Sequence, residues 1–311
     1  MLSEYIDEEV RFIKKQFLCC VPIKNISWNN FFTCPTWDRQ GTLIANTVDL
    51  DIVKKYPIKL NYQVAFLKYL IDRLERLEDT DINDCVYDAL GRLVSLVDAG
   101  KCYKHYYFNF KGKNRIITLE ENLSIISEGT TGLCSWQASL ALSEWCLRNS
   151  ELFKNKTILE LGAGVGLTGL VIALNYFETN RNSEISAFDS LLKVDTESFS
   201  VSVINLPWEN VKTQIDKFKD IDLVLAADVV YDSSLFECLS DALKCFLSNG
   251  QCQKVYLACT ERNRKTLWEF LEQLEDRNLL YEELLLPEQG YFHWSTEVPI
   301  RLFCIEKGSF N

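Results

Sequence analysis

The chain of 311 residues has little of several residue types that mark common functional sites. It has two histidines, His105 and His293, and its twelve cysteines include no Cys-x-x-Cys pair. Zinc sites are usually built from such pairs and from clustered histidines, so no metal site is expected. The scattered cysteines indicate reduced thiols in a cytoplasmic protein.

Long apolar runs and basic stretches are also missing from the sequence. A membrane-spanning helix needs about 18 consecutive apolar residues, and no such run occurs. The opening residues MLSEYIDEEVRF are too acidic for a signal or transit peptide. The formal net charge is −11, whereas nucleic-acid binders usually carry a basic face. We expect neither a membrane nor a nucleic acid as a direct partner, and we expect a monomer.

The spacing of hydrophobic residues divides the chain into two predicted regions. Residues 1–100 predict an N-terminal helical region, which either caps the rest of the protein or contributes to substrate recognition. Its two apolar helical faces consist of Leu60, Val64, Leu67, Ile71, Leu74 and Leu77, then Val86, Leu90, Leu93, Val94 and Val97. Residues 101–311 predict a Rossmann-like domain that includes a leading β-hairpin over Tyr103–Leu119. Strands and helices alternate from Ser127 onward, which is typical of a doubly wound α/β sheet, and a closing antiparallel pair is expected at the end.

The most informative segment is TILELGAGVGLTG, residues 157–169. A short apolar strand ends near Glu160, and the turn Gly162-Ala163-Gly164 follows before a helical pattern. Glycines allow a tight turn and close approach of a ligand. A carboxylate at this place would repel the pyrophosphate of a dinucleotide, whereas it tolerates the cationic end of S-adenosylmethionine. The pattern therefore favours S-adenosylmethionine over NAD, although such a turn can also occur without a ligand.

A second group of candidate residues follows a later apolar run. The segment IDLVLAADVVYD, residues 221–232, reads as a buried strand that ends in Ala226, Ala227 and Asp228, with Tyr231 three residues on. Open α/β sheets place their ligands at the carboxyl ends of strands. Asp228 and Tyr231 are therefore expected to line one cleft. The alternatives are that Asp228 is the N-cap of a helix beginning near Ser233 and that Tyr231 is a packing residue.

Two tryptophans flank these segments. Trp136 precedes an apolar-periodic helix in TTGLCSWQASLALSEW, and Trp208 ends the alternating strand VSVINLPWE. The order of the glycine turn, the two tryptophans and the Asp-x-x-Tyr motif resembles the seven-β-strand protein-lysine methyltransferases. The N-terminal half, notably LDIVKKYPIKLNYQVAFLKYL, resembles the members that act on elongation factor 2, over roughly residues 50–306.

The resemblance implies a Rossmann-like seven-strand sheet, S-adenosylmethionine as cofactor and elongation factor 2 as protein substrate. It implies catalytic roles for Asp228, which would orient the lysine ammonium, and for Tyr231, which would shape the lysine channel. The residues expected to bind the cofactor are Trp136, Glu160, Gly162, Ala163, Gly164, Asp189, Trp208, Ala226 and Ala227. Without the resemblance, both tryptophans could equally be core aromatics.

The sequence departs from the family after its second predicted strand. Asp189, in EISAFDS, is the candidate for the ribose hydroxyls, but the next strand begins soon afterwards. The intervening LLKVDTESF is too short for a parallel crossover with its helix, so about twenty residues are missing relative to the family. We expect lower stability and weaker cofactor binding at this end of the pocket.

Two other functions stay open. The shortened segment makes a catalytically impaired, methyltransferase-like binding module an alternative. A methyltransferase for another protein, a small molecule or a nucleic acid is the second. Asp228-Val-Val-Tyr231 lacks the two prolines typical of enzymes of this fold that methylate nucleic-acid amines, which favours an aliphatic amine as acceptor.

Overall fold

The computed structural model describes residues 7–97, 100, 102–121, 134–176, 183–187, 193–195 and 200–308, with the backbone alone for 176, 183–187, 193–195 and 200. The chain divides into two compact units. One comprises Met1–Ile125 with Ser183–Ala187, and the other comprises Ile126–Asn182 with Phe188–Asn311. The β-hairpin groups with the N-terminal helices in this division, and the domain boundary near residue 100 stays a prediction.

The first unit begins with five α-helices. They are α1 (Glu8–Leu18), α2 (Trp37–Ala45), α3 (Asp51–Lys55), α4 (Leu60–Glu75) and α5 (Asp84–Val94). Their buried faces form one core, in which the rings of Trp28 and Phe66 stack at 5.3 Å. The predicted faces of α4 and α5 are confirmed except at Val94 and Val97. Val97 is 92% exposed because α5 ends at Val94, before the periodic pattern does.

The predicted hairpin is present. Strands β1 (Cys102–Phe110) and β2 (Lys113–Glu121) pair antiparallel around a two-residue turn, Lys111-Gly112. Both turn residues have positive φ, 51° and 76°. Two positive φ values are typical of the tight turn that matches the twist of a hairpin. Strand β4 (Ser183–Ala187) adds to β2 in parallel and completes a three-stranded sheet.

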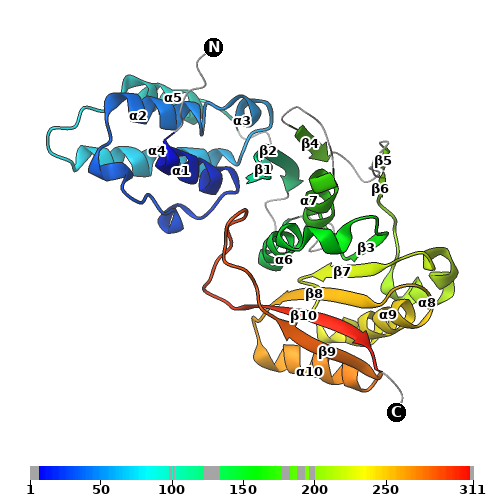
Figure 1. Ribbon diagram of the computed structural model, residues 1–311. Coiled ribbons are helices and arrows are strands. Elements are labelled where there is room, and N and C mark those ends of the chain that lie inside the picture. Colours follow the sequence, from blue (N-terminus) through cyan, green and yellow to red (C-terminus); the bar gives the residue numbers. More distant parts are fainter. Residues whose placement is uncertain are drawn as a thin grey trace. The chain divides into compact units, whose positions relative to one another are not determined.

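The second unit is built on a five-stranded mixed sheet (Figure 1). Its order is β3 (Ile158–Leu161), β7 (Leu223–Ala227), β8 (Lys254–Thr260), β10 (Ile300–Lys307) and β9 (Leu279–Leu284). The first three strands are parallel, and β10 runs antiparallel to both neighbours. The α/β class and the closing antiparallel pair are confirmed.

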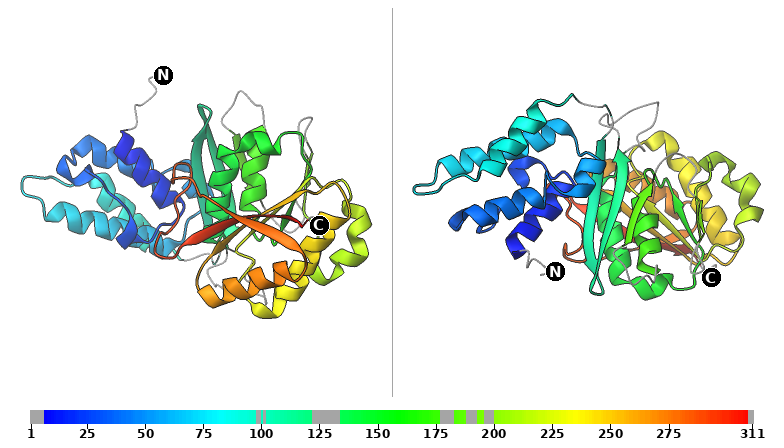
Figure 2. Two further views of the ribbon diagram at one scale, coloured as in Figure 1. Left: turned by 60° about the horizontal axis from the view of Figure 1, so that its bottom comes forward. Right: turned by 90° about the horizontal axis from the view of Figure 1, so that it is seen from above.

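Helices cover both faces of this sheet (Figures 1 and 2). Strand β7 shows why, because successive side chains point to opposite faces of a strand. Leu223 and Leu225 pack with α6 (Gln137–Arg148) and α7 (Leu167–Tyr176). Val224 and Ala226 pack with α8 (Val211–Gln214), α9 (Phe236–Ser248) and α10 (Arg264–Glu275). A strand buried on both faces explains the nearly continuous apolar run in the sequence.

The expected second and third strands do not join this sheet. Strand β4 contains the segment predicted as the second strand, but it pairs with β2. Of the segment predicted as the third strand, residues 201–209, only Val201 and Ser202 are strand; they belong to β6 (Ser200–Ser202), which pairs antiparallel with β5 (Lys193–Asp195). Trp208 instead begins a short 3-10 helix. The physical reason is the short connection between β4 and β6. A parallel crossover needs a dozen or more residues, and β5 already occupies part of that stretch.

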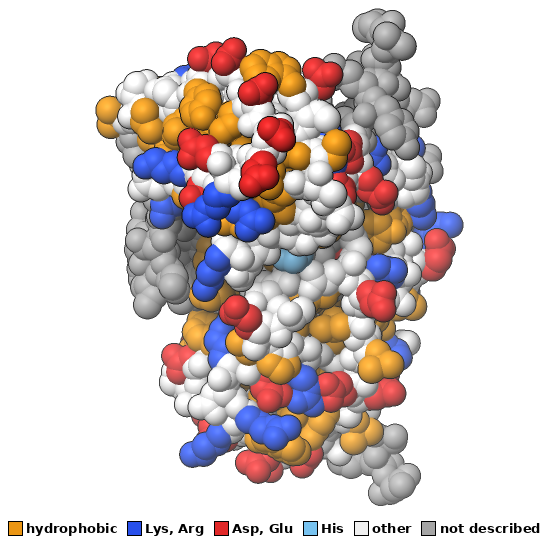
Figure 3. Space-filling model, turned by 90° about the vertical axis from the view of Figure 1, so that its left-hand side faces the viewer, with side chains coloured by type: hydrophobic (Ala, Val, Ile, Leu, Met, Phe, Trp, Pro, Cys, Tyr) orange, Lys and Arg blue, Asp and Glu red, His pale blue; other side chains and the backbone are white. Residues whose placement is uncertain are grey.

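The cysteines and the surface charges can be described for most of the chain. All twelve cysteines lie in the described part of the chain and are free. Among the helices described, none is long and apolar enough to cross a membrane. Acidic and basic side chains are interspersed over the face that Figure 3 shows.

Candidate active site

A pocket of about 240 Å³ opens in the second unit at the carboxyl ends of β3 and β7. Its walls come from the turn after β3, the segment before α6, the loop after β7 and Trp208. The lining residues are Cys134, Ser135, Trp136, Ser139, Glu160, Gly162, Ala163, Gly164, Val165, Leu167, Trp208, Ala227, Asp228, Val229 and Tyr231. Segments far apart in the sequence therefore meet at the strand ends, which is the usual ligand position in an open α/β sheet.

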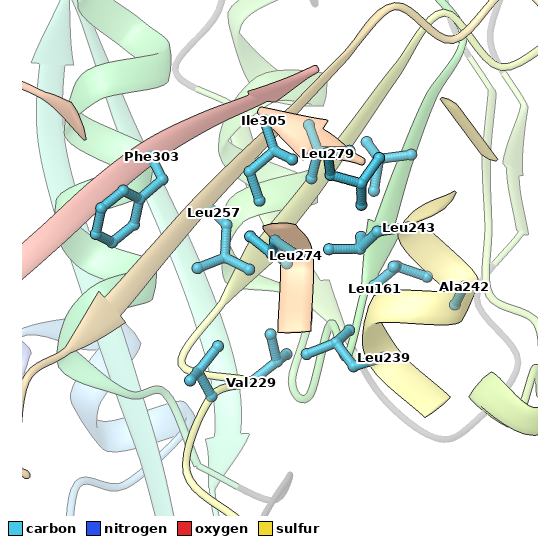
Figure 4. Packing of buried hydrophobic residues seen from close by; sticks show 14 of the residues in the cluster. Leu161, Val229, Leu239, Ala242, Leu243, Leu257, Leu274, Leu279, Phe303 and Ile305 are labelled. Carbon is cyan, nitrogen blue, oxygen red and sulfur yellow. The ribbon is translucent and has the colours of Figure 1, made fainter. Parts of the chain in front are cut away.

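The glycine turn forms one wall and requires glycine for two reasons. Gly162 and Gly164 have φ values of 63° and 57°, which L side chains rarely adopt. A Cβ on Gly162 would also lie 2.7 Å from Val229 Cγ1. Leu161, which precedes Gly162, and Val229 both belong to the core cluster between the sheet and helices α9 and α10 (Figure 4). The core therefore fixes the turn in place.

Glu160 stands at the base of this wall, on β3. Its Oε2 accepts a hydrogen bond of 2.9 Å from the backbone N–H of Gly169 in α7. Desolvation of the carboxyl group raises its pKa to about 7, and the bond from Gly169 only partly offsets this effect. A cation placed in the pocket beside Glu160 would favour the ionised form.

Aromatic side chains line the rest of the pocket. Trp136 directly precedes α6, and Trp208 lies close enough to the glycine turn that its Cζ2 would be 3.6 Å from a Cβ on Gly162. Both indoles are only partly buried and line the pocket. Tyr231 is 48% exposed and also belongs to the lining. These three rings are therefore not simple core aromatics.

Asp228 follows β7 directly and has a left-handed backbone, with φ 53°. Its side chain is only 2% exposed. The carboxylate accepts hydrogen bonds from Thr260 N at 2.8 Å, Thr260 Oγ1 at 2.9 Å and Ala138 N at 3.1 Å. The guanidinium of Arg262 completes the set, with its two terminal nitrogens 3.3 Å and 3.5 Å from the carboxylate oxygens.

The alternative role as an N-cap near Ser233 is wrong for Asp228. Asp232 accepts the hydrogen bond from Ser234 N at 3.0 Å and caps that turn. Asp228 instead satisfies an amide in the first turn of α6, where Trp136 at the N-cap position provides no side-chain bond. It thereby fastens α6 to the ends of β7 and β8.

Most of the predicted site residues meet in this pocket. They are Trp136, Glu160, Gly162, Ala163, Gly164, Trp208, Ala227, Asp228 and Tyr231. Ala226 does not line it, because its side chain is buried in the cluster on the opposite face of β7. Asp189 lies outside the described residues.

Among the site residues that sequence reasoning missed are two serines and the two residues that hold Asp228. Ser135 and Ser139 line the pocket, and Thr260 and Arg262 hold Asp228. Ser135 Oγ is buried and has no hydrogen-bond partner among the described residues. The sequence offered one indication of Thr260, which is the last residue of the apolar strand β8 beside β7. Nothing in the sequence connects Arg262 with Asp228.

Comparisons with known proteins identify the family. The sequence model of the lysine methyltransferase family matches residues 113–277. The mouse protein-lysine N-methyltransferase EEF2KMT is 31% identical over 265 residues, which cover 78% of this chain and 77% of the relative. The human EEF2KMT is 29% identical, over 93% of this chain and 94% of the relative. The protein-lysine N-methyltransferase EFM3 of Chaetomium thermophilum is 33% identical, over 68% and 71%.

The family model covers more than half of the chain and includes the glycine turn and Asp228. The expectation of a protein-lysine N-methyltransferase is thereby confirmed at the level of the family. This chain belongs to the lysine methyltransferase family.

Proposed function

We propose that this chain methylates a lysine side chain of elongation factor 2 with S-adenosylmethionine as the methyl donor. The observation that carries the proposal is one pocket in which the turn of Gly162 and Gly164, the Glu160 carboxyl and the motif of Asp228 and Tyr231 come together. Membership of the lysine methyltransferase family supports the reaction. The choice of elongation factor 2 rests on the similarity of the N-terminal half to the members that act on it.

The residues of the pocket fit this cofactor. The turn after β3 lets a ligand approach the backbone closely, because no Cβ projects from Gly162 or Gly164. The hydroxyl of Ser135, which has no hydrogen-bond partner in the described part of the chain, offers a hydrogen bond to a ligand in the pocket. Glu160 suits the ammonium of the amino-acid end, and the partly exposed faces of Trp136 and Trp208 suit flat or cationic groups. Asp189 is proposed for the ribose.

When bound, the cofactor supplies a methyl group on a sulfonium, which is already a strong electrophile. The chain must then present the acceptor as a neutral amine. A free lysine has a pKa near 10.4, so roughly one in a thousand is neutral at pH 7. We propose that Tyr231 forms the wall along which the lysine enters, and that the aromatic walls exclude water. Positioning of the amine supplies most of the remaining rate.

Asp228 has a different place in this proposal from the one that the resemblance implies. Its carboxylate already accepts bonds from Thr260 and from α6, so it holds the pocket together. It influences the acceptor through its charge and through the position of Trp136. We propose the cytoplasm as the location and a monomer as the working form.

The experiment is a transfer assay with labelled S-adenosylmethionine. The purified chain is incubated with purified elongation factor 2 and, separately, with a lysate of cells that lack the enzyme. The expected result is label on one lysine of elongation factor 2 and a single labelled band in the lysate. Label on another protein alone would refute the substrate, and label on no protein would refute the activity.

A second candidate is a binding module without turnover. The pairing of β4 with β2 and of β5 with β6, instead of with strands of the five-stranded sheet, favours it. Calorimetry of cofactor binding, combined with the transfer assay, separates the two candidates. The module would bind S-adenosylmethionine without transferring the methyl group, and insertion of the missing crossover segment of about twenty residues should then restore transfer.

A further inference from the structure

The Asp228 carboxylate has no capacity left for a substrate ammonium. A carboxylate offers about four lone-pair sites. Oδ1 accepts from Thr260 N and Arg262, and Oδ2 accepts from Ala138 N, Thr260 Oγ1 and Arg262. The backbone and hydroxyl donors belong to Thr260 at the end of β8 and to Ala138 in the first turn of α6, so their positions are set by these elements. The guanidinium is therefore the component that decides whether Asp228 presents a free or a compensated charge to the pocket.

Arg262 also contacts a second pocket residue. Its Cζ lies 5.0 Å from the centre of the Trp136 ring, a cation–π distance. The side chain is 41% exposed, so it lies at the surface beside the pocket. One guanidinium thus touches both the indole that lines the pocket and the carboxylate that fixes α6. The backbone N–H of Arg262 donates a 2.8 Å hydrogen bond to Thr260 O, which fixes the backbone from which the Arg262 side chain extends.

We propose that Arg262 is a positioning residue of this site, which holds Trp136 against the pocket and compensates the charge of Asp228 so that the acceptor lysine is used as a neutral amine. This inference rests on the proposed transfer to a lysine. An uncompensated Asp228 would hold the lysine as an ammonium and oppose its deprotonation, because an opposite charge nearby favours the charged form. With Arg262 in place, the arriving lysine meets a nearly neutral pair.

Other titratable groups surround the pair and are the same in every variant considered. Glu160, Tyr231 and Cys134 line the pocket. Cys259 on β8 stays a neutral thiol, because burial raises its pKa to about 12. Glu261 is bonded to Arg301 and lies 3.6 Å from Arg264. A change in the pH profile that follows Arg262 alone can therefore be attributed to its charge.

The decisive variant is Arg262→Gln, compared with Arg264→Gln. Arg264 has the same charge two residues away, is 78% exposed and pairs only with Glu261 among the described residues. Methylation rates are measured at saturating cofactor from pH 6 to pH 10. We expect the acidic limb of the Arg262→Gln profile to move up by about one pH unit, which is about a tenfold lower rate at pH 7. The rate should recover toward wild type at high pH, and Arg264→Gln should match wild type.

A purely structural role would lower the rate equally at every pH, and that outcome overturns the charge compensation. Asp228→Asn/Arg262→Gln provides a second arm, because without the carboxylate there is no charge to uncover. The shift should then disappear relative to Asp228→Asn. A shift of equal size in both backgrounds overturns the proposal as well.

Cofactor binding separates this proposal from the proposed function. If wild type binds S-adenosylmethionine but methylates no protein, the proposed function fails. The hold on Trp136 is still tested by calorimetry and by tryptophan fluorescence. Arg262→Gln should bind S-adenosylmethionine about tenfold more weakly than Arg264→Gln, with altered indole emission. Equal affinities and identical spectra would overturn the positioning role.

Discussion

Glu160 should make cofactor binding depend on pH below neutrality. Its pKa of about 7 arises from desolvation of the carboxyl group. If the ionised form is the one that holds the cationic amino-acid end, apparent affinity follows the ionised fraction. That fraction is about one half at pH 7 and about one tenth at pH 6. Affinity for S-adenosylmethionine should therefore fall about fivefold over this unit and nearly tenfold over the next.

Calorimetry in two buffers with different ionisation enthalpies measures this linkage directly. Binding at pH 6 should release close to one proton per cofactor molecule. Above pH 7.5 the Glu160 carboxyl is mostly ionised already, so binding should release only a small fraction of a proton from it. Glu160→Gln is the control. It cannot ionise and nearly preserves the side-chain volume, so its affinity should be low and independent of pH between 5.5 and 7. Any pH dependence of affinity that this variant retains comes from ionisation of the cofactor or of other groups in the protein.

The same pKa has a consequence for stability in the absence of cofactor. A carboxyl group whose pKa is raised on folding supports the folded state below its unfolded pKa, and this support is lost as pH rises through the folded value. For Glu160 the window runs from about pH 4.5 to about pH 7, and the loss is at most about 3 kcal/mol. Glu160→Gln should therefore melt at a higher temperature than wild type at pH 8. Equal melting temperatures together with a flat affinity profile in wild type would refute the raised pKa.

Three further changes test the frame of the site and the first unit. Gly162→Ala should lower cofactor affinity more than tenfold, measured by calorimetry, because its Cβ meets Val229 and its φ is positive. Asp228→Ala should destabilise the protein by about 3–5 kcal/mol in urea unfolding, because it leaves Arg262 and buried donors unpaired; a loss below 1 kcal/mol would contradict this. His105 is fully buried, and desolvation lowers its pKa to about 4. The free energy of unfolding of the first unit should therefore fall by about 3 kcal/mol as pH falls from 6.5 to 4. In urea unfolding at several pH values, His105→Gln should make this loss smaller.

Local patterns predicted the strands and helices that carry the pocket. The glycine turn after β3 and the apolar run of β7 have strong signals within a dozen residues. Their meeting follows from a general rule, since parallel strands end on the same edge. The hairpin of β1 and β2 was equally readable, because Lys111-Gly112 separates two strands of matching pattern.

What the sequence did not show depends on contacts between distant segments. Strand β4 has the composition of a sheet strand, but its partner depends on the length of the chain that follows it. The apolar spacing of α5 continues to Val97, although the helix ends at Val94. The spacing alone does not say where a helix ends. Ala226 has the same local signal as Ala227, and only the alternation along β7 decides which of them faces the pocket.

Asp228 illustrates the difference between locating a residue and assigning its role. The sequence placed it at the strand end, where the structure has it. Its donors come from Ala138, Thr260 and Arg262, which lie 90, 32 and 34 residues away. A carboxylate that accepts this many bonds acts by fixing its neighbours. The consequence for a lysine acceptor is favourable, because methyl transfer needs a neutral amine and a compensated carboxylate does not hold the ammonium form. Under the proposed function, the lysine enters along Tyr231 and gives its proton to water.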